Sequence, residues 1–500
     1  MTTLNMNLTE AASTLLTSTL IGDQTTTFTG IAIDSRLVQA GDLFFCISGT
    51  AQDGHQYAPK AVEQGAAALV VERQLELDIP QLIVKEARHA LAVISNAFYR
   101  YPSQEVKLIG VTGTNGKTTT TYLIERILQD AAISTGVVGT IEMRYAGQVF
   151  PMSGTTPSSY DLQRSLRDMA DQDVKACAIE VSSHALEQLR VAGSRFRVAV
   201  FTNLTQDHLD YHGSMEAYRD AKGLLFSRLG NTYSATEQER SYAVLNADDE
   251  ASAVFKRMTT AETVMYGMHE GADVRATDIR ITAQGTKFHV HTFKGSADIQ
   301  LRMVGKFNVY NALAAISVGL IEGIELSAIV NSLESIEGVA GRVEAVQAGQ
   351  QFSVIVDYAH TPDGLENVLQ TVKEFAEGRI FCVFGCGGDR DRKKRPIMGQ
   401  IAARYADYLL VTSDNPRTEV PDLILVDIEE GLKADKVSEE RYELIVDRKA
   451  AITKAIEMAS PNDVVLIAGK GHETYQIIGT EILDFDDRKV AEEAIRGIGS

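Results

Sequence analysis

Short apolar runs alternate with segments of helical periodicity along most of the chain. Apolar runs bounded by Gly, Asn, Asp or Pro are typical of buried strands, and apolar residues at helical spacing are typical of helices. Strands that alternate with helices predict an α/β fold with mainly parallel sheets, because parallel strands need a crossover between them. Residues 263–307 differ, because apolar and polar positions alternate there around glycines, and this predicts a small antiparallel sheet.

Breaks in this pattern predict three domains. Pro102-Ser103 ends the first α/β unit, and Gly341-Arg342 separates the second from the third. We expect a small N-terminal α/β domain over 1–103, a central domain over 104–341 with a P-loop ATPase-like, mainly parallel sheet, and a Rossmann-like C-terminal α/β domain over 342–500. The expected strands are 31–36 and 42–47 in the first; 108–113, 135–141, 176–183, 197–204 and 242–249 in the second; and 352–358, 379–385, 407–413, 442–447 and 463–469 in the third.

The composition is that of an acidic globular protein. The 48 Lys+Arg and 67 Asp+Glu give a formal net charge of −19, and 44% of the residues are apolar. The apolar content excludes a disordered chain, and the acidity argues against a nucleic-acid partner, which needs a basic face. No stretch reaches the ~20 apolar residues that span a bilayer. The start of the chain predicts no signal peptide, and we expect free buried thiols, a cytoplasmic location and a monomer.

The segment from Thr112 to Thr119 carries the clearest chemistry. It follows an apolar strand and opens a helix, so its backbone N–H groups can surround phosphate oxygens. Lys117 adds a positive charge, and the Thr118 hydroxyl can reach a magnesium ion. Only two residues separate Gly113 from Gly116, which is more compact than the generic P-loop. The expected phosphate-binding residues are Gly113, Thr114, Asn115, Gly116, Lys117, Thr118 and Thr119.

This loop resembles that of the Mur ligase family, the ATP-dependent amide-bond-forming enzymes of peptidoglycan synthesis. The resemblance covers nearly the whole chain, because further motifs follow in family order in all three units. They are Asp34-Ser35-Arg36, Thr155-Thr156-Pro157, Glu180 to His184, Asn203 to Asp210, Ala221-Lys222, Asn308 to Asn311, Gly341 to Glu344, Asp357 to Pro362, and Gly469 to Glu473.

The resemblance implies a catalytic centre with magnesium and ATP as co-substrate. Its catalytic residues would be Lys117, Lys222, His208 and Glu180, and its metal site would use Thr118, Glu180, His208 and Lys222. Lys222 matches the position of a carbamylated lysine, N6-carboxylysine, whose carboxylate-like group can help bind a second magnesium. Asn311, Arg342, Asp357 and His360 match positions at the nucleotide.

The other two substrates are implied in the same way. The contacts to a UDP-sugar-dipeptide would be Ser35, Thr155, Thr156, Ser182, Gln188 and Arg190. Asp414-Asn415-Pro416-Arg417 matches the motif that marks use of meso-diaminopimelate, and Arg390, Gly469 and Glu473 complete that site. The chemistry agrees, because diaminopimelate has a carboxylate that lysine lacks, and a guanidinium can bind it through two hydrogen bonds.

The implied reaction joins these substrates. ATP would phosphorylate the D-glutamyl γ-carboxylate of UDP-N-acetylmuramoyl-L-alanyl-D-glutamate, and an amine of meso-diaminopimelate would attack the acyl phosphate. Two other functions remain as alternatives, namely the same ligase using L-lysine and a folylpolyglutamate synthase-like ligase. A nucleotide-switched binding protein would share only the P-loop, and the absence of an Asn-Lys-x-Asp motif argues against a GTPase.

Overall fold

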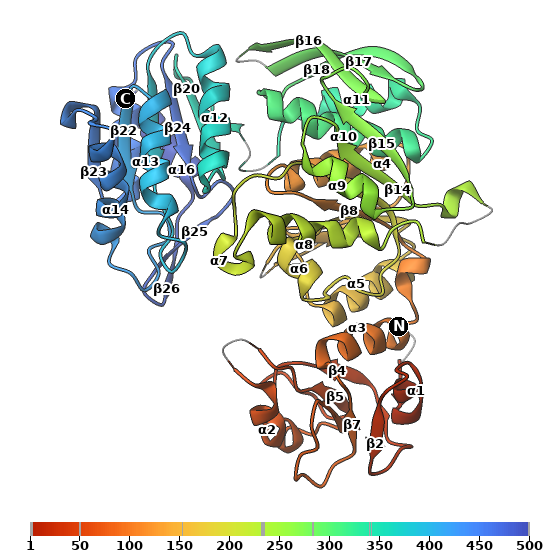
Figure 1. Ribbon diagram of the computed structural model, residues 1–500. Helices are drawn as coiled ribbons and strands as arrows, with labels where there is room; N and C mark the ends of the chain where they lie inside the picture. The colour runs from red at the N-terminus through yellow and green to blue at the C-terminus, as the bar shows by residue number, and fades with distance from the viewer. Residues whose placement is uncertain are drawn as a thin grey trace.

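The computed structural model describes residues 4–49, 52–152, 154–231, 236–282, 285–339, 341 and 343–498. Three units follow one another along the chain (Figure 1). The N-terminal unit lies below the central one, and the C-terminal unit, in blue, lies beside the central one. Within the described ranges, no helix is long and apolar enough to cross a membrane.

The N-terminal unit is built on a five-stranded sheet of order β2-β7-β6-β5-β4. The expected strand over 31–36 is shorter in the structure, because β4 ends at Ala32 and the Asp34 carboxylate accepts the backbone N–H of Arg36 in a turn. The elements are β1 (Met6–Asn7), α1 (Leu8–Ser13), β2 (Thr19–Ile21), β3 (Thr27–Phe28), β4 (Gly30–Ala32), β5 (Asp42–Phe45), the 3₁₀ turn Gly54–Tyr57, α2 (Ala58–Glu63), β6 (Ala68–Val71), β7 (Gln81–Ile83) and α3 (Ala87–Phe98).

An eleven-stranded sheet of order β11-β10-β9-β12-β8-β13-β14-β15-β16-β17-β18 forms the central unit. Its strands are β8 (Lys107–Thr112), β9 (Thr135–Val138), β10 (Met143–Tyr145), β11 (Gln148–Phe150), β12 (Ala176–Glu180), β13 (Phe196–Phe201), β14 (Tyr242–Asn246), β15 (Glu262–Gly267), β16 (Val274–Thr282), β17 (Gly285–Thr292) and β18 (Gly295–Leu301). In the order of the sheet, the seven strands β9-β12-β8-β13-β14-β15-β16 are parallel to one another. The prediction of an antiparallel sheet over 263–307 is therefore wrong for β15 and right for β16 to β18.

Helices cover both faces of this sheet. One apolar core joins the sheet to α4, α10 and α11, and a second joins it to α5, α6, α8 and α9. Helix α10 is buried on nearly every side, as its continuous apolar sequence requires. The helices are α4 (Lys117–Asp130), α5 (Ser159–Asp171), α6 (Ser183–Glu187), α7 (Leu209–His212), α8 (Met215–Ser227), α9 (Ala251–Met258), α10 (Lys306–Ile321) and α11 (Leu326–Ser335), with 3₁₀ turns at Pro102–Gln104 and Glu237–Glu239.

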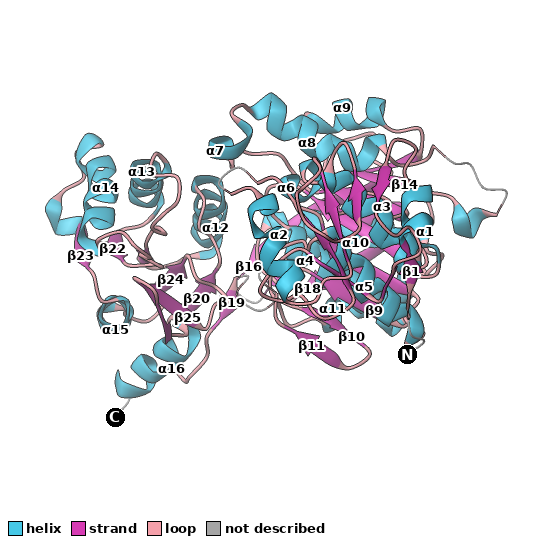
Figure 2. Cartoon of the chain, turned by 90° about the horizontal axis from the view of Figure 1, so that it is seen from below, coloured by secondary structure: helices cyan, strands magenta, loops and turns pink. Residues whose placement is uncertain are grey.

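The C-terminal unit has a six-stranded sheet of order β19-β20-β24-β21-β22-β23, parallel except for β19. Figure 2 shows α12, α13 and α14 on one face and α15 and α16 on the other. The elements are β19 (Glu344–Ala345), β20 (Ser353–Asp357), α12 (Pro362–Phe375), β21 (Ile380–Phe384), α13 (Lys394–Tyr405), β22 (Tyr408–Thr412), α14 (Pro421–Ala434), the 3₁₀ turn Glu439–Arg441, β23 (Tyr442–Ile445), α15 (Arg448–Met458), β24 (Val464–Ala468), β25 (Tyr475–Ile478), β26 (Glu481–Asp484) and α16 (Asp487–Ile498). The expected α/β fold with parallel sheets is confirmed.

Helices α13 and α14 approach each other closely at two glycines. A Cβ atom on Gly431 would lie 2.0 Å from the carbonyl oxygen of Pro396, and one on Gly399 would lie 2.6 Å from that of Ile428. Backbone atoms cannot move aside as a flexible side chain can, so the contact requires residues without a side chain.

We expect Gly431→Ala to lower the free energy of unfolding by about 1–3 kcal/mol, the usual effect of overpacking. Denaturant unfolding followed by circular dichroism measures it. Gly497→Ala is the control, because no atom lies within 4 Å of a Cβ added there. The control should keep or slightly raise the stability, since alanine favours a helix over glycine. Equal stability of both variants would contradict the close helix contact.

Candidate active site

The glycine loop between β8 and α4 needs its glycines for space as well as for backbone conformation. Gly113 has φ +150° and Gly116 has φ +82°, both in the range that disfavours other residues. A Cβ on Gly113 would lie 1.9 Å from Thr202 Oγ1, and one on Gly116 would lie 2.4 Å from Asn311 Oδ1. The loop is therefore fitted against both the end of β13 and helix α10.

Two lysines donate to the same backbone oxygen of this loop. Lys117 Nζ lies 2.9 Å and Lys222 Nζ 2.8 Å from the carbonyl oxygen of Gly113. Lys222 is fully buried on α8, with its Nζ 4.4 Å from the ring centroid of Tyr218. Burial, and then the charge of Lys117, lower the pKa of Lys222 well below its usual value. The shift favours the neutral form of the Lys222 amine.

Glu180 lies at the carboxyl end of β12 and is 1% exposed. Its Oε1 accepts the backbone N–H of Thr140 at 2.9 Å, and its Oε2 accepts the Thr140 hydroxyl at 3.0 Å. Glu180 pairs with Val111 of β8, one residue before the end of that strand. The carboxylate is thus held at the same sheet edge as the glycine loop.

His208 directly precedes α7 and has φ +54°, a left-handed conformation. Its Nε2 lies 3.3 Å from Asp207 Oδ2, and its ring packs 4.8 Å from that of His184 and 6.0 Å from that of Tyr218. Burial lowers the pKa of His208 to about 4, although Asp207 opposes the shift. The imidazole is neutral at physiological pH, the form that binds metals.

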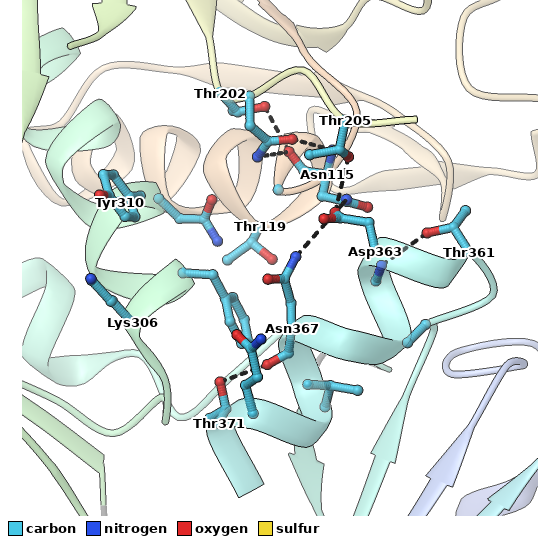
Figure 3. A pocket seen from close by; sticks show the side chains of 18 of the residues that line it. Asn115, Thr119, Thr202, Thr205, Lys306, Tyr310, Thr361, Asp363, Asn367 and Thr371 are labelled. Carbon is cyan, nitrogen blue, oxygen red and sulfur yellow. Dashed lines mark hydrogen bonds between the residues drawn. The ribbon is translucent and has the colours of Figure 1, made fainter. Parts of the chain in front are cut away.

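A cavity of about 380 Å³ lies between the central and C-terminal units (Figure 3). Six of the residues predicted for the nucleotide line it, namely Asn115, Gly116, Thr119, Asn311, Asp357 and His360. Asp357 shapes its rim, because its carboxylate accepts the backbone N–H groups of Val343 and Ala359, each at 2.8 Å. The predicted residue Arg342 lies outside the described residues. Lys306 and Tyr310 also line the cavity, and sequence reasoning missed both.

Asp363, which was not predicted, joins the two units at this cavity. Its Oδ2 accepts the Asn115 amide at 2.5 Å and the Thr205 hydroxyl at 2.9 Å, as Figure 3 shows. Burial raises the pKa of Asp363, although these donors oppose the shift. The start of α12 is thereby tied to the glycine loop. Pro362 and Asp363 are the first residues of α12, and nothing in the sequence indicated the partners of Asp363.

A second cavity, of about 830 Å³, opens between the same two units. Its lining brings together six of the seven residues predicted for diaminopimelate, namely Arg390, Asp414, Asn415, Arg417, Gly469 and Glu473, and it also contains His208 and His360. Pro416 does not line it. A Cβ on Gly388 would lie 1.8 Å from the Pro416 oxygen, so Pro416 and Gly388 fix the path of this loop.

The side chains of this cavity are tied to one another. Glu473 Oε2 accepts Asn415 Nδ2 at 2.9 Å and Lys470 Nζ at 2.8 Å. Lys470 is fully buried and was not predicted. Arg417 adopts φ +52°, and its Nη1 donates to the Gly388 oxygen at 2.9 Å. The cations and carboxylates are therefore fixed before any ligand arrives.

The third cavity, of about 590 Å³, lies between the N-terminal and central units. Thr156, Gln188 and Arg190 line it, joined by hydrogen bonds from Arg190 to the Thr156 oxygen at 2.9 Å and to Gln188 Oε1 at 2.7 Å. Thr155 and Ser182 adjoin it, bonded to Thr140 and Thr156 respectively. Ser35 is buried and, like Thr155 and Ser182, is not among the residues that line this cavity.

Two arginines of the third cavity were missed. Arg88 comes from α3 of the N-terminal unit and Arg164 from α5 of the central unit. Burial and the nearby charge of Arg88 lower the pKa of Arg190. Cations gathered in this way suit an anionic ligand. In the sequence, both missed arginines look like ordinary exposed positions of amphipathic helices.

Comparison with known proteins identifies the class of this molecule. Residues 27–115 match the Mur ligase family, catalytic domain; residues 111–319 match the Mur ligase middle domain; and residues 341–471 match the Mur ligase, glutamate ligase domain. The chain therefore belongs to the Mur ligase family, whose members are ATP-dependent ligases.

Several relatives found by the comparison carry the name of one particular ligase of this family. The chain is 52% identical over 469 residues to UDP-N-acetylmuramoyl-L-alanyl-D-glutamate--2,6-diaminopimelate ligase of Geobacillus kaustophilus, covering 94% of this chain and 95% of the relative. It is 47% identical over 490 residues to the enzyme of the same name from Listeria monocytogenes. That alignment covers 98% of this chain and 99% of the relative. A solved structure of an enzyme of that name aligns with a TM-score of 0.70 and 32% identity over 99% of this chain and all of that one.

More distant structures share the fold alone. MurF ligase from Thermotoga maritima, solved in complex with ADP, aligns with a TM-score of 0.62 at 19% identity over 94% of this chain and 96% of that one. Folylpolyglutamate synthase from Mycobacterium tuberculosis aligns with a TM-score of 0.61 at 17% identity, but over only 82% of this chain and 94% of that one.

The glycine loop yields a direct prediction. Gly116→Ala should weaken ATP binding by ~10–100-fold, because left-handed strain costs about 1–3 kcal/mol and the new Cβ meets Asn311. Calorimetric titration with ATP measures the change. Gly147→Ala is the matched control, because Gly147 has a similar φ of +75° in a turn where no atom lies within 4 Å of an added Cβ. ATP affinity lost equally in both variants would contradict the local explanation.

Proposed function

We propose that this chain is the ATP-dependent ligase that adds meso-diaminopimelate to the D-glutamyl γ-carboxylate of UDP-N-acetylmuramoyl-L-alanyl-D-glutamate during peptidoglycan synthesis in the cytoplasm. The observation that carries the proposal is the second cavity, where Arg390, Arg417 and Glu473 face a space that also contains His208. Cations and a carboxylate on one wall suit an amino acid with two carboxylates and two ammonium groups. The names of the relatives support the same substrates.

The arrangement of the cavities fits three substrates that meet at one point. We assign ATP to the first cavity, diaminopimelate to the second and the UDP-sugar-dipeptide to the third. The γ-phosphate of ATP transfers to the D-glutamyl carboxylate, which releases ADP and gives an acyl phosphate. The amine of diaminopimelate attacks the acyl carbon, forms the amide and releases phosphate. The protein supplies position and charge neutralisation, and Lys117 stabilises the charge on the transferring phosphoryl group.

The residues of the site fit a magnesium ion only together with the substrates. Thr118, Glu180 and the neutral imidazole of His208 supply oxygen and nitrogen donors, yet among the described residues no three His, Cys, Asp or Glu side chains gather into a metal site. Magnesium typically keeps few protein ligands and completes its shell with phosphates and water. When bound, magnesium neutralises phosphate charge and orients the transferring group.

Lys222 fits the modification expected of it. Carbon dioxide adds to a neutral amine, and burial beside Lys117 favours the neutral form. The resulting carbamate would place an anion beside Lys117, the remaining cation at the Gly113 oxygen. We therefore propose N6-carboxylysine at this position, where it can join Thr118, Glu180 and His208 as a magnesium ligand.

The first prediction concerns the amino acid. In the unmodified enzyme with the UDP-sugar-dipeptide and ATP, phosphate release should depend on meso-diaminopimelate, with L-lysine supporting a rate at least ~10⁴-fold lower. The reason is that lysine leaves the guanidinium of Arg417 without a carboxylate to pair with. Arg417→Ala should lose most activity with diaminopimelate. Lys449→Ala, an exposed position of the same unit, is the control. Efficient use of lysine would contradict the assignment, and phosphate release with glutamate and a folate would favour the folylpolyglutamate synthase-like alternative.

The second prediction concerns Lys222. Lys222→Ala should lose nearly all turnover, partly restored by a short-chain carboxylate that replaces the carbamate. Lys256→Ala, an exposed lysine of α9, is the control and should keep full turnover. Wild-type rates in Lys222→Ala, at unchanged thermal stability, would exclude a catalytic role. Carbon-13 NMR after exchange with labelled bicarbonate tests the modification directly.

A further inference from the structure

A fully buried ion pair lies behind the second cavity, and neither of its residues lines the cavity. Arg448 begins α15 and Asp487 begins α16, and both side chains are 0% exposed. Arg448 Nε lies 2.8 Å from Asp487 Oδ1, and Nη2 lies 2.7 Å from Oδ2. An apolar pair of similar volume would hold the two helices equally well or better, so helix packing alone does not explain these charges.

The remaining donors of Arg448 reach two strand ends. Nη1 donates to the Ser413 oxygen at 3.3 Å, and Nη2 donates to the Ala468 oxygen at 3.0 Å. Ser413 follows β22 directly, and Ala468 is the last residue of β24. These strands are not neighbours, because β21 lies between them in the sheet. One guanidinium therefore links two strand ends across a third strand.

Both linked ends lead at once into the second cavity. The residue after Ser413 is Asp414, and the residue after Ala468 is Gly469, and both line that cavity. A Cβ on Gly469 would lie 2.7 Å from Asp414 Oδ2 and 3.9 Å from Arg448 Nη2, so the three residues pack in one cluster. A shift of Arg448 must therefore move both loops.

We propose that the Arg448–Asp487 pair is a positioning pair that sets the spacing of the two loops, 414–417 and 469–473, that recognise the amino-acid substrate. The inference rests on the proposed function, because it concerns the same amino-acid site. Asp487 holds the guanidinium in the one orientation that reaches both carbonyl oxygens. A planar guanidinium can do so, whereas a lysine ammonium on a flexible stem cannot fix two oxygens and a carboxylate in one plane.

The test is the double variant Arg448→Met with Asp487→Leu, compared with Arg448→Lys. The double variant removes both buried charges, so neither is left without a partner, and we expect it to fold. We expect the KM for meso-diaminopimelate to rise ~10–100-fold in the double variant, since small misplacement of binding groups has effects of that order. The KM values for ATP and the UDP-sugar-dipeptide should stay near those of the unmodified enzyme. Arg448→Lys should raise the KM for diaminopimelate as well.

The control is Arg379→Met, at the opposite edge of the same sheet. Arg379 pairs with Asp463 at 3.0 Å beside the first residues of β21 and β24, away from the cavity. Loss of the Arg379 guanidinium should leave the KM for diaminopimelate unchanged.

The outcomes separate the two hypotheses. If the unmodified enzyme releases no phosphate with diaminopimelate, the proposed function fails. If the unmodified enzyme is active but the double variant keeps its KM for diaminopimelate, the positioning role is overturned. An equal rise in all three KM values would show a general structural role and would also overturn it. Should the double variant not fold, Arg448→Lys decides, because an unchanged KM for diaminopimelate in that variant contradicts the inference.

Discussion

The carbonyl oxygen of Gly113 accepts hydrogen bonds from two lysines, and the proposed active centre is arranged around this contact. Two ammonium groups on one oxygen repel each other, and the repulsion is strong where water is excluded. The structure reduces it by burying Lys222 completely, which favours its neutral form. A neutral amine and one remaining cation beside the glycine loop suit the phosphoryl transfer and the lysine modification proposed for this site.

The direction of the parallel strands places the other groups around that contact. The carboxyl ends of β8, β12 and β13 lie at one edge of the central sheet, so Glu180 and the glycine loop meet there. The C-terminal sheet turns its own carboxyl edge, with Asp414 and Gly469, toward the same space. Asp363 spans the gap, because its carboxylate accepts hydrogen bonds from Asn115 and Thr205 of the central unit. Two sheets with different strand orders are thereby joined at the first cavity, to which we assign ATP.

The sequence predicted the features that depend on local pattern, and it missed residues whose roles depend on contacts with distant parts of the chain. Buried parallel strands are nearly continuous apolar runs, so they and the glycine loop were found directly. The strand expected over 31–36 stops at Ala32 because Asp34 forms a turn, and β15 pairs in parallel although its sequence alternates. Asp363 and Lys470 were missed, because a charged residue near a helix start or in a loop is usually solvated. Only the folded chain shows what each one contacts.

The charged side chains that line the second cavity are held in place by further polar groups behind them. Arg417 and Glu473 face the space, and behind Glu473 lies Lys470, fully buried. Lys470 also donates to Asn415 Oδ1 at 3.1 Å, so the loops 414–417 and 469–473 are linked by side chains as well as by Arg448. Lys470 holds Glu473 and Asn415, and the backbone oxygens of Gly388 and Asn415 hold Arg417, so little reorganisation of these side chains remains for binding. A site fixed in this way would discriminate by charge position, because a ligand without the second carboxylate leaves the Arg417 guanidinium without a counter-ion and the site cannot rearrange to accommodate it.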